Sequence, residues 1–226
     1  MEFLFADCLF NLILQFPYFG NARNGLTYSP NDVVEKDEGI LVLRSSNIQN
    51  GKLFFEDNVY LKNVGENFLV QKGDIIICSR NGSRELVGKN ALIDSNIKAY
   101  FGAFMLIYRC DSPRYVYYVF NSGMFNYYLS SFSTTTINQL TIGNFNNMIV
   151  PLPPLAEQKT IADFLDKKCS AIDSAVDVAK KLVAKLRDYK KSLITETVTK
   201  GLNPSAAMQD SGIEWLGANS FALENY

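Results

Sequence analysis

Three short stretches bring together arginine, asparagine, serine and threonine side chains that can hydrogen-bond to an external ligand. An arginine can present a two-pronged donor to guanine, an asparagine or glutamine fits adenine, and serine and threonine reach phosphates or bases. Solvated turns use the same residue types, so for any single residue both interpretations stay open. The candidate residues are Arg44, Ser45, Ser46 and Asn47; Ser79, Arg80, Asn81, Ser83, Arg84 and Lys89; and Thr134, Thr135, Thr136 and Asn138.

Residue sets that support catalysis are missing from the sequence. The chain contains no histidine, and its four cysteines, Cys8, Cys78, Cys110 and Cys169, are far apart and form no CxxC pair. This argues against the usual zinc sites and against Ser/His or Cys/His catalysis. No glycine-rich phosphate loop is present, and the acidic residues lack the spacing of a metal-dependent nuclease. We therefore expect no catalytic residue, no metal site and no cofactor in this chain.

Charge gives little indication of the partner. The chain has 226 residues, enough for one or two domains with a real core. The net charge of -1 and the pI near 5.6 are not typical of a protein that binds a polyanion. The charge is uneven, because residues 155–201 hold ten Lys/Arg and seven Asp/Glu, whereas residues 1–150 hold twelve and thirteen. Local patches can attract a polyanion even when the total is near neutral.

Residues 20–150 alternate short β-prone runs with turn signals such as Asn50-Gly51, which predicts a β-rich unit. Within it, residues 112–130 predict a pair of helices broken at Ser122-Gly123, and we expect their aromatic side chains in the core. The predicted strands are residues 40–43, 59–61, 74–78, 90–93 and 103–108.

The two ends of the chain are harder to interpret. Residues 1–19 are apolar, but Asp7 and Asn11 interrupt them, so neither a signal peptide nor a membrane span is predicted. The last nine residues show no pattern, and a frayed tail is expected there.

One long helix is predicted to follow the prolines of residues 151–154. No glycine or proline occurs from about Ala156 to Lys200, and Gly201 is a stop signal. Apolar positions alternate spacings of three and four, which is typical of packing against one long partner helix. The helix could instead pack on its own domain; we favour a coiled-coil arm whose partner comes from another chain. The seam comprises Ile172, Ala175, Ala179, Leu182, Leu186, Tyr189 and Leu193.

The motifs of this region resemble the specificity subunits of type I restriction–modification systems. They are VPLPPLAEQ at 150–158, IADFLD at 161–166 and YKKSLITETVTKG at 189–201, and they cover about fifty residues. In the preceding part, KGDIIICSRNGS at 72–83 also resembles a feature of the family. MQDSGIEWLG at 208–217 resembles the segment that precedes a recognition domain in full-length members.

The resemblance implies an α+β fold in three parts. A mixed, β-rich DNA target-recognition domain would occupy residues 1–150. Residues 151–201 would form a proline-rich entry and a long coiled-coil helix for spacing and dimerisation. Residues 202–226 would be a tail that starts an interrupted second repeat. A full-length member carries two recognition domains held apart by two antiparallel helices, so this chain would be a half-length form.

The implied function is non-catalytic recognition of one half of a bipartite DNA target, and the resemblance favours DNA contact for the three polar stretches. Adenine methyltransferase and restriction subunits would dock on the chain and would use S-adenosylmethionine, ATP and Mg. Two copies would pair as a homodimer on a symmetric target, or one copy would pair with another specificity polypeptide. A cytoplasmic location without a membrane is expected. The alternatives are a stand-alone enzyme and a truncated fragment or scaffold that does not bind DNA.

Overall fold

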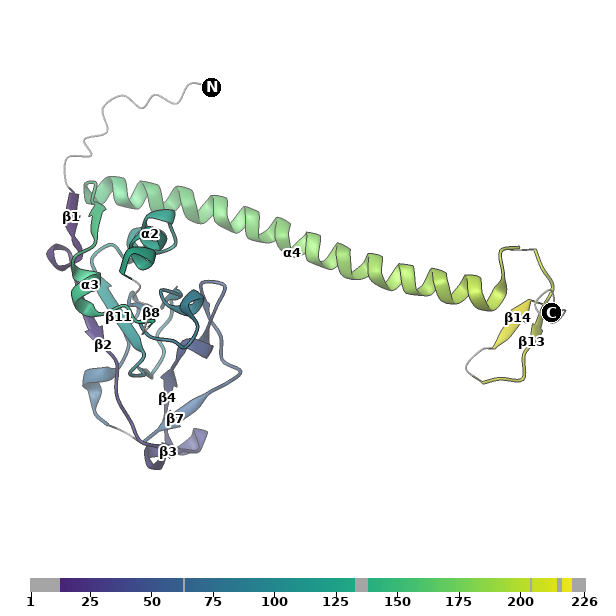
Figure 1. Cartoon of the computed structure of the whole chain (residues 1–226), viewed down its shortest axis with the longest axis horizontal. Coiled ribbons are helices and arrows are strands. Elements are labelled where there is room, and N and C mark those ends of the chain that lie inside the picture. Colours follow the sequence, from purple (N-terminus) through teal and green to yellow (C-terminus); the bar gives the residue numbers. More distant parts are fainter. Residues whose placement is uncertain (1–12, 63, 133–137, 204, 215–216, 221–226) are drawn as a thin grey trace, which may run out of the picture. The chain divides into compact units, whose positions relative to one another are not determined.

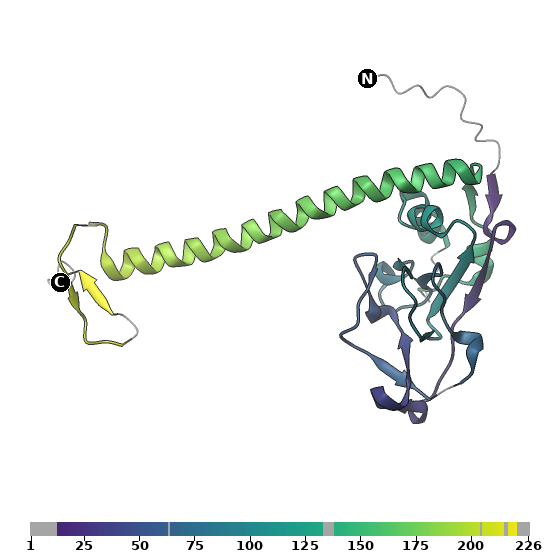
Figure 2. The ribbon, with the colours of Figure 1, turned by 180° about the vertical axis from the view of Figure 1, so that it is seen from behind.

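The computed structural model describes residues 13–62, 64–132, 138–203, 205–214 and 217–220. The chain divides into two compact units, Met1–Leu165 and Asp166–Tyr226, and each is described by itself. The first unit is rich in strands and the second is mainly helix, as the two opposite views show (Figure 1, Figure 2). The predicted α+β fold class, with a β-rich part followed by one long helix, is confirmed.

Two four-stranded sheets form the frame of the first unit. One sheet has the order β2-β11-β8-β9 and is antiparallel throughout. The other has the order β10-β4-β7-β3, in which β10 and β4 are parallel. The Ile-Ile-Ile-Cys sequence of β8 is buried along its whole length, so both of its faces contact apolar side chains. The bounds are β2 Gly20–Asn24, β3 Val33–Val34, β4 Ile40–Leu43, β7 Val59–Leu61, β8 Ile75–Cys78, β9 Asn90–Leu92, β10 Ala99–Phe101 and β11 Met105–Cys110.

Two small sheets complete this frame. β1 (Ile13–Gln15) pairs with β12 (Ile149–Pro151), so residues near both ends of the unit lie side by side. β5 (Ile48–Gln49) and β6 (Lys52–Leu53) form a hairpin. Its turn residues Asn50 and Gly51 both have positive φ, at 50° and 74°, which is the conformation that the predicted Asn-Gly turn requires.

The predicted helix pair is confirmed as α1 (Pro113–Phe120) and α2 (Gly123–Phe132), and a short α3 (Ile142–Asn146) precedes β12. Their aromatic side chains build much of the core: Phe120 and Phe125 are buried and join Phe16, Tyr108 and Phe145 in one cluster. The Tyr108 hydroxyl donates to the Phe16 carbonyl at 2.8 Å. Single 3₁₀ turns occupy Phe16–Tyr18, Pro30–Asp32, Lys36–Glu38, Ser45–Asn47, Glu66–Phe68 and Arg84–Leu86.

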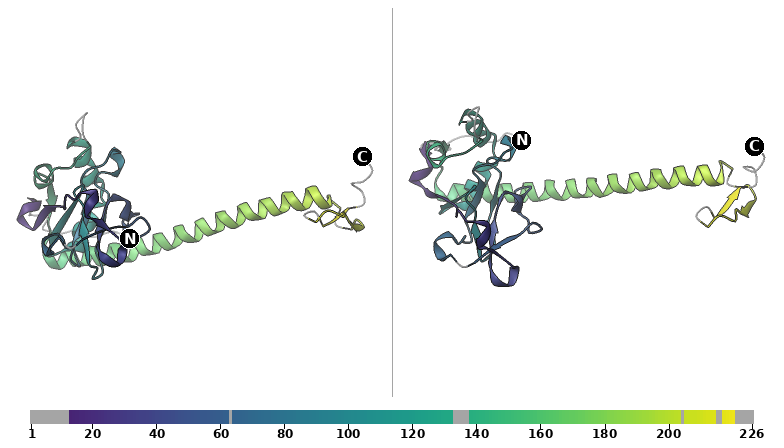
Figure 3. Two further views of the ribbon diagram at one scale, coloured as in Figure 1. Left: turned by 90° about the horizontal axis from the view of Figure 1, so that it is seen from below. Right: turned by 60° about the horizontal axis from the view of Figure 1, so that its bottom comes forward.

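The predicted long helix is α4 (Leu155–Lys200), which has 46 residues. It is about 70 Å long at about 1.5 Å per residue, and it is unbroken from two further directions (Figure 3). Gly201, at φ 77°, ends it as expected. The prediction of a frayed end is wrong for Ala218–Ser220, because these residues form β14 and pair with β13 (Met208–Asp210). Within the part of the chain that the structure describes, no helix combines the length and the hydrophobicity needed to cross a membrane.

Candidate nucleic-acid interface

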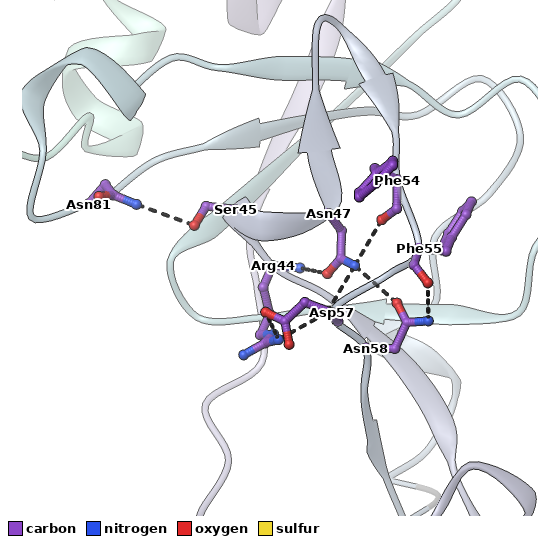
Figure 4. A network of polar contacts seen from close by, with 8 residues as sticks. All are labelled: Arg44, Ser45, Asn47, Phe54, Phe55, Asp57, Asn58 and Asn81. Atoms are coloured by element: carbon purple, nitrogen blue, oxygen red, sulfur yellow. Dashed lines mark hydrogen bonds and ion pairs between the residues drawn. The ribbon is translucent and has the colours of Figure 1, made fainter. Parts of the chain in front are cut away.

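Described residues of all three polar stretches contact one another, the third stretch being represented by Asn138. The first loop follows β4, the second follows β8, and the third leads into α3. The Asn81 side-chain amide donates to the Ser45 hydroxyl oxygen at 3.2 Å, and this contact is drawn in Figure 4. The Asn138 amide donates to the Gly82 carbonyl at 3.0 Å, and a backbone bridge joins Arg80 to Gln139. One surface therefore combines residues that are far apart in the sequence.

Asn47 is fully buried, whereas its neighbours in the first loop are half-buried. Its side chain is 0% exposed, and its Nδ2 donates to the Phe54 carbonyl at 3.0 Å and to Asn58 Oδ1 at 3.2 Å. Its Oδ1 accepts a hydrogen bond from the Arg44 backbone N–H at 2.9 Å (Figure 4). An enclosed amide whose groups are used within the loop has no free edge for a base. The expectation that Asn47 contacts a ligand is therefore corrected: it holds the loop in shape.

Arg44 and Ser46 in the same loop line a hollow of about 580 Å³ beside Phe104. The Arg44 guanidinium pairs with the Asp57 carboxylate, with Nη2 to Oδ2 at 2.8 Å (Figure 4). The Arg44 Nε and the Ser46 hydroxyl are buried and make no hydrogen bond within the described residues. Buried polar atoms are nearly always paired, so these two groups are suited to a ligand that enters the hollow.

The second loop places Arg80 at the surface, with its guanidinium carbon 5.3 Å from the centre of the Phe104 ring. The Phe104 carbonyl accepts hydrogen bonds from the backbone N–H groups of Ser79 and Arg80, at 2.9 and 3.2 Å. Phe104 itself is 57% exposed, although it is large and apolar. A positive charge stacked on an exposed ring forms a flat surface that can pack against bases or sugars.

The remaining predicted residues of these loops differ in exposure. Ser83 and Arg84 are exposed, and Arg84 Nη2 donates to the Ser130 carbonyl at 3.4 Å. Lys89 is half-buried, and its ammonium donates to the Ser45 carbonyl at 3.0 Å. Ser79 is only 4% exposed. The predicted residues Thr134, Thr135 and Thr136 lie outside the described residues.

The local charge of this surface differs from that of the whole chain. Its basic side chains are Arg44, Arg80, Arg84 and Lys89. Its acids are Asp57, which lines the hollow beside Phe104, and Glu85, which lines a second hollow of about 310 Å³ beside α2. The surface is therefore positive although the chain carries a net charge of -1. Local excess of this kind is what draws a polyanion to a nearly neutral protein.

Sequence reasoning missed Phe104, because residues 103–108 form one apolar run that predicts a strand. In the structure β11 begins at Met105, so Phe104 belongs to the turn before it. The preceding Gly102-Ala103 pair is the only local signal that could have separated this ring from the strand. Among the described residues, no group of three or more His, Cys, Asp or Glu side chains could hold a metal ion.

Comparison with known proteins assigns the family. Residues 19–180 match the family described as type I restriction modification DNA specificity domain. The chain is 30% identical over 207 residues to the specificity subunit of type I restriction enzyme StySPI from Salmonella potsdam, covering 88% of this chain and 45% of that protein. It is 34% identical over 158 residues to the EcoKI specificity subunit of Escherichia coli K12, covering 66% of this chain and 34% of that protein.

Solved structures share the fold. The HsdS subunit from Thermoanaerobacter tengcongensis gives a TM-score of 0.57 at 17% identity, covering 87% of this chain and 50% of that one. A structure described as showing complex assembly and conformational transition of the type I R-M system gives 0.69 at 17% identity, covering 84% and 46%. The chain spans about half the length of the curated relatives that it matches, or less. Because the family match runs through most of the β-rich unit and into the long helix, the chain belongs to the type I restriction modification DNA specificity family.

Proposed function

We propose that this chain is a DNA-recognition chain of a type I restriction–modification system, and that its recognition domain (residues 13–150) reads one half of a bipartite target. The observation that carries this proposal is that the second loop contacts the first through Asn81 and the third through Gly82, and also presents Arg80 stacked on the exposed Phe104 ring. Base readout needs hydrogen-bonding side chains from several loops held in a fixed geometry, and the contacts between Ser45, Asn81 and Asn138 supply that geometry.

The proposed contacts divide by chemistry. Arg80 carries the fork that suits a guanine edge, and Asn138 carries an amide that suits adenine. The Asn81 amide donates to Ser45 and accepts from the Ser83 backbone N–H, so Asn81 positions the two loops. Arg84 and Lys89 suit phosphates, which fix register without reading sequence. The other proposed contacts are Arg44, Ser45, Ser46 and Ser83.

The arm formed by α4 is proposed to pair with a second chain. Its seam is uncovered, with Ile172 60% exposed and Leu186 56% exposed. Burying a leucine of this kind yields about 1.5–3 kcal/mol, so a seam of seven residues supports a stable pair. The partner is a second copy, which would read a two-fold symmetric target, or a different specificity polypeptide.

Charge along the arm favours an antiparallel pair. Residues 155–177 hold five acids and three bases, whereas residues 178–200 hold seven bases and two acids, so the halves carry -2 and +5. Parallel pairing would set the two basic halves side by side. Antiparallel pairing sets each basic half against an acidic half, which lowers the repulsion between the helices. Two recognition domains would then stand at opposite ends of the pair.

Catalysis is proposed to reside in partner subunits. Methyltransferase and restriction subunits would bind this chain in the cytoplasm and use S-adenosylmethionine, ATP and Mg. This chain would recognise the DNA sequence at which they act. What supports this assignment is membership of the specificity family, together with a sequence that contains no histidine.

The test is a set of binding curves for the purified full chain on a library of DNA duplexes at several salt concentrations. A recognition chain should enrich particular sequences, and its affinity should fall steeply with salt because phosphate contacts release counterions. Substituting Arg84 and Lys89 by alanine should weaken all sequences alike and reduce the salt slope. Binding that is equal for all duplexes, with or without these changes, would favour a fragment that no longer reads DNA.

A further inference from the structure

An apolar hollow of about 490 Å³ lies in the first unit where α4 begins, and it shares no residue with the polar loops. Its walls include Phe19, Val116, Leu152, Pro154 and Leu155. Leu155, the first residue of α4, is large and apolar, yet it is 62% exposed. None of the proposed DNA contacts uses this hollow. Among the described residues, its apolar walls are therefore not assigned to any other contact.

Gln158 adds one unsatisfied acceptor to the same hollow. Its side chain is 3% exposed, and its Nε2 donates to the Pro153 carbonyl at 2.7 Å. Its Oε1 is buried and accepts no hydrogen bond within the described residues. An unpaired buried acceptor destabilises a fold unless a donor reaches it. Apolar walls together with one such acceptor suit a peptide segment, which brings apolar side chains and backbone N–H donors.

The antiparallel arm indicates which peptide arrives there. When the two seams pair in opposite directions, Ile172 of one copy lies level with Leu193 of the other. In the same register Leu165 lies level with Lys200, where α4 of the second copy ends. From Leu165 back to Gln158 is about 10 Å at about 1.5 Å per residue. Four extended residues span about 13 Å, and eleven residues separate Gly201 from Ile213, so the segment after Gly201 of the second copy is long enough to reach the hollow even with its turn at Asn203–Ala206.

That segment carries apolar side chains without cover. Leu202 is 88% exposed, Met208 is 45% exposed and Ile213 is 44% exposed. We propose that the hollow at the start of α4 receives the tail of a second copy, with tail apolar side chains on its walls and a tail donor on Gln158 Oε1. The proposal rests on the pairing of two copies described above. Two such contacts, one at each end, lock the register of the arm.

Cross-linking between differently tagged full-length chains tests the contact. One chain carries Leu155→Cys and the other carries Met208→Cys or Ile213→Cys. Cys8 and Cys169 are changed to serine in both chains, and Cys110, which lines the hollow itself, is changed to alanine. We expect a disulfide that joins the two tags under mild oxidation, and none when the first chain keeps Leu155. If light scattering shows a dimer but neither tail position cross-links to the other tag, the tail docks elsewhere and the proposal fails. If the chains are monomeric, the pairing itself is wrong.

A double-mutant cycle measures the same contact without cysteines. Leu155→Asp in the hollow and Ile213→Asp in the tail should each weaken the dimer about tenfold or more, and together they should cost little more than either alone. The helix tolerates Leu155→Asp because an acid near its N-terminus is favourable. Phe55→Asp is the control, because this exposed side chain lines neither the hollow nor the arm. Effects of the two changes that simply add would contradict a direct contact.

Discussion

The recognition domain buries its large apolar side chains, whereas the arm exposes them. In the domain, Phe16 and Phe145 are 0% exposed and their rings stack at 4.6 Å between centroids. In the arm, Leu182 and Leu186 are each 56% exposed. The domain therefore completes its own core, whereas the arm has an apolar seam that the described residues leave uncovered. Stability should therefore depend on the domain, and assembly on the arm.

The largest expected effect is in the core of the domain. Phe145→Ala should lower the free energy of unfolding by about 4 kcal/mol, because it removes a buried ring from the aromatic cluster and leaves a cavity. Leu186→Ala in the arm should change the unfolding of the recognition domain by less than about 0.5 kcal/mol. Denaturant unfolding followed by circular dichroism measures the free energy of unfolding of both variants. Equal losses would remove the distinction between the two regions.

The second effect sharpens the comparison at the arm. Leu186→Lys should raise the dissociation constant of the pair about 100-fold, because a charge enters the seam. Val198→Lys is the matched control, since Val198 is 71% exposed and lies on the face away from the seam. Sedimentation at several concentrations gives both constants. A similar loss in the two variants would mean that the pairing face has been misassigned.

A smaller effect is expected for the exposed ring of the domain. Phe104→Ala should reduce discrimination between the best duplex and a mismatched one about tenfold, while the salt slope stays the same, because the ring contacts bases or sugars and carries no charge. Tyr127→Ala controls for loss of an exposed aromatic, because Tyr127 is 71% exposed and lies on α2. Competition binding at one salt concentration measures the ratio. An unchanged ratio would assign readout to the polar side chains alone.

The smallest effect concerns the thiols of the two regions. Burial raises the pKa of Cys110 to about 12 and also raises the pKa of Cys78, and both belong to the domain. In the unfolded chain a thiol has a pKa of about 8.5. The stability that comes from the buried neutral thiol is therefore fully present below that pH, and it is lost as the pH rises toward the pKa in the folded state. The domain should therefore unfold more easily at pH 10 than at pH 8, and Cys110→Ala should reduce this difference. Unfolding midpoints at pH 8 and pH 10 measure it, and a flat profile for the unmodified chain would contradict the burial of these thiols.

Residue types in the sequence could propose polar loops as the candidate site, and could not say which of their side chains are exposed. Asn47 and Asn81 both follow a buried strand and look alike in the sequence, yet the first is enclosed and the second bonds across to Ser45. Their difference arises from residues 54–58, which return to the first loop and enclose Asn47. Phe104 was assigned to a strand because strand ends depend on pairing partners that a local pattern does not contain.

The amino-acid sequence alone determined the features whose causes are local. The extent of α4 follows from the stretch between the prolines and Gly201, and the turn at Asn50 and Gly51 follows from the two residues that tolerate positive φ. Its motifs also indicated the family. Only the tertiary structure decided that Asn81 contacts both Ser45 and Asn138 and that Phe104 lies against the second loop, because sheet pairing between distant strands brings these loops together. The hollow at the start of α4 has the same origin, since its walls come from segments more than a hundred residues apart.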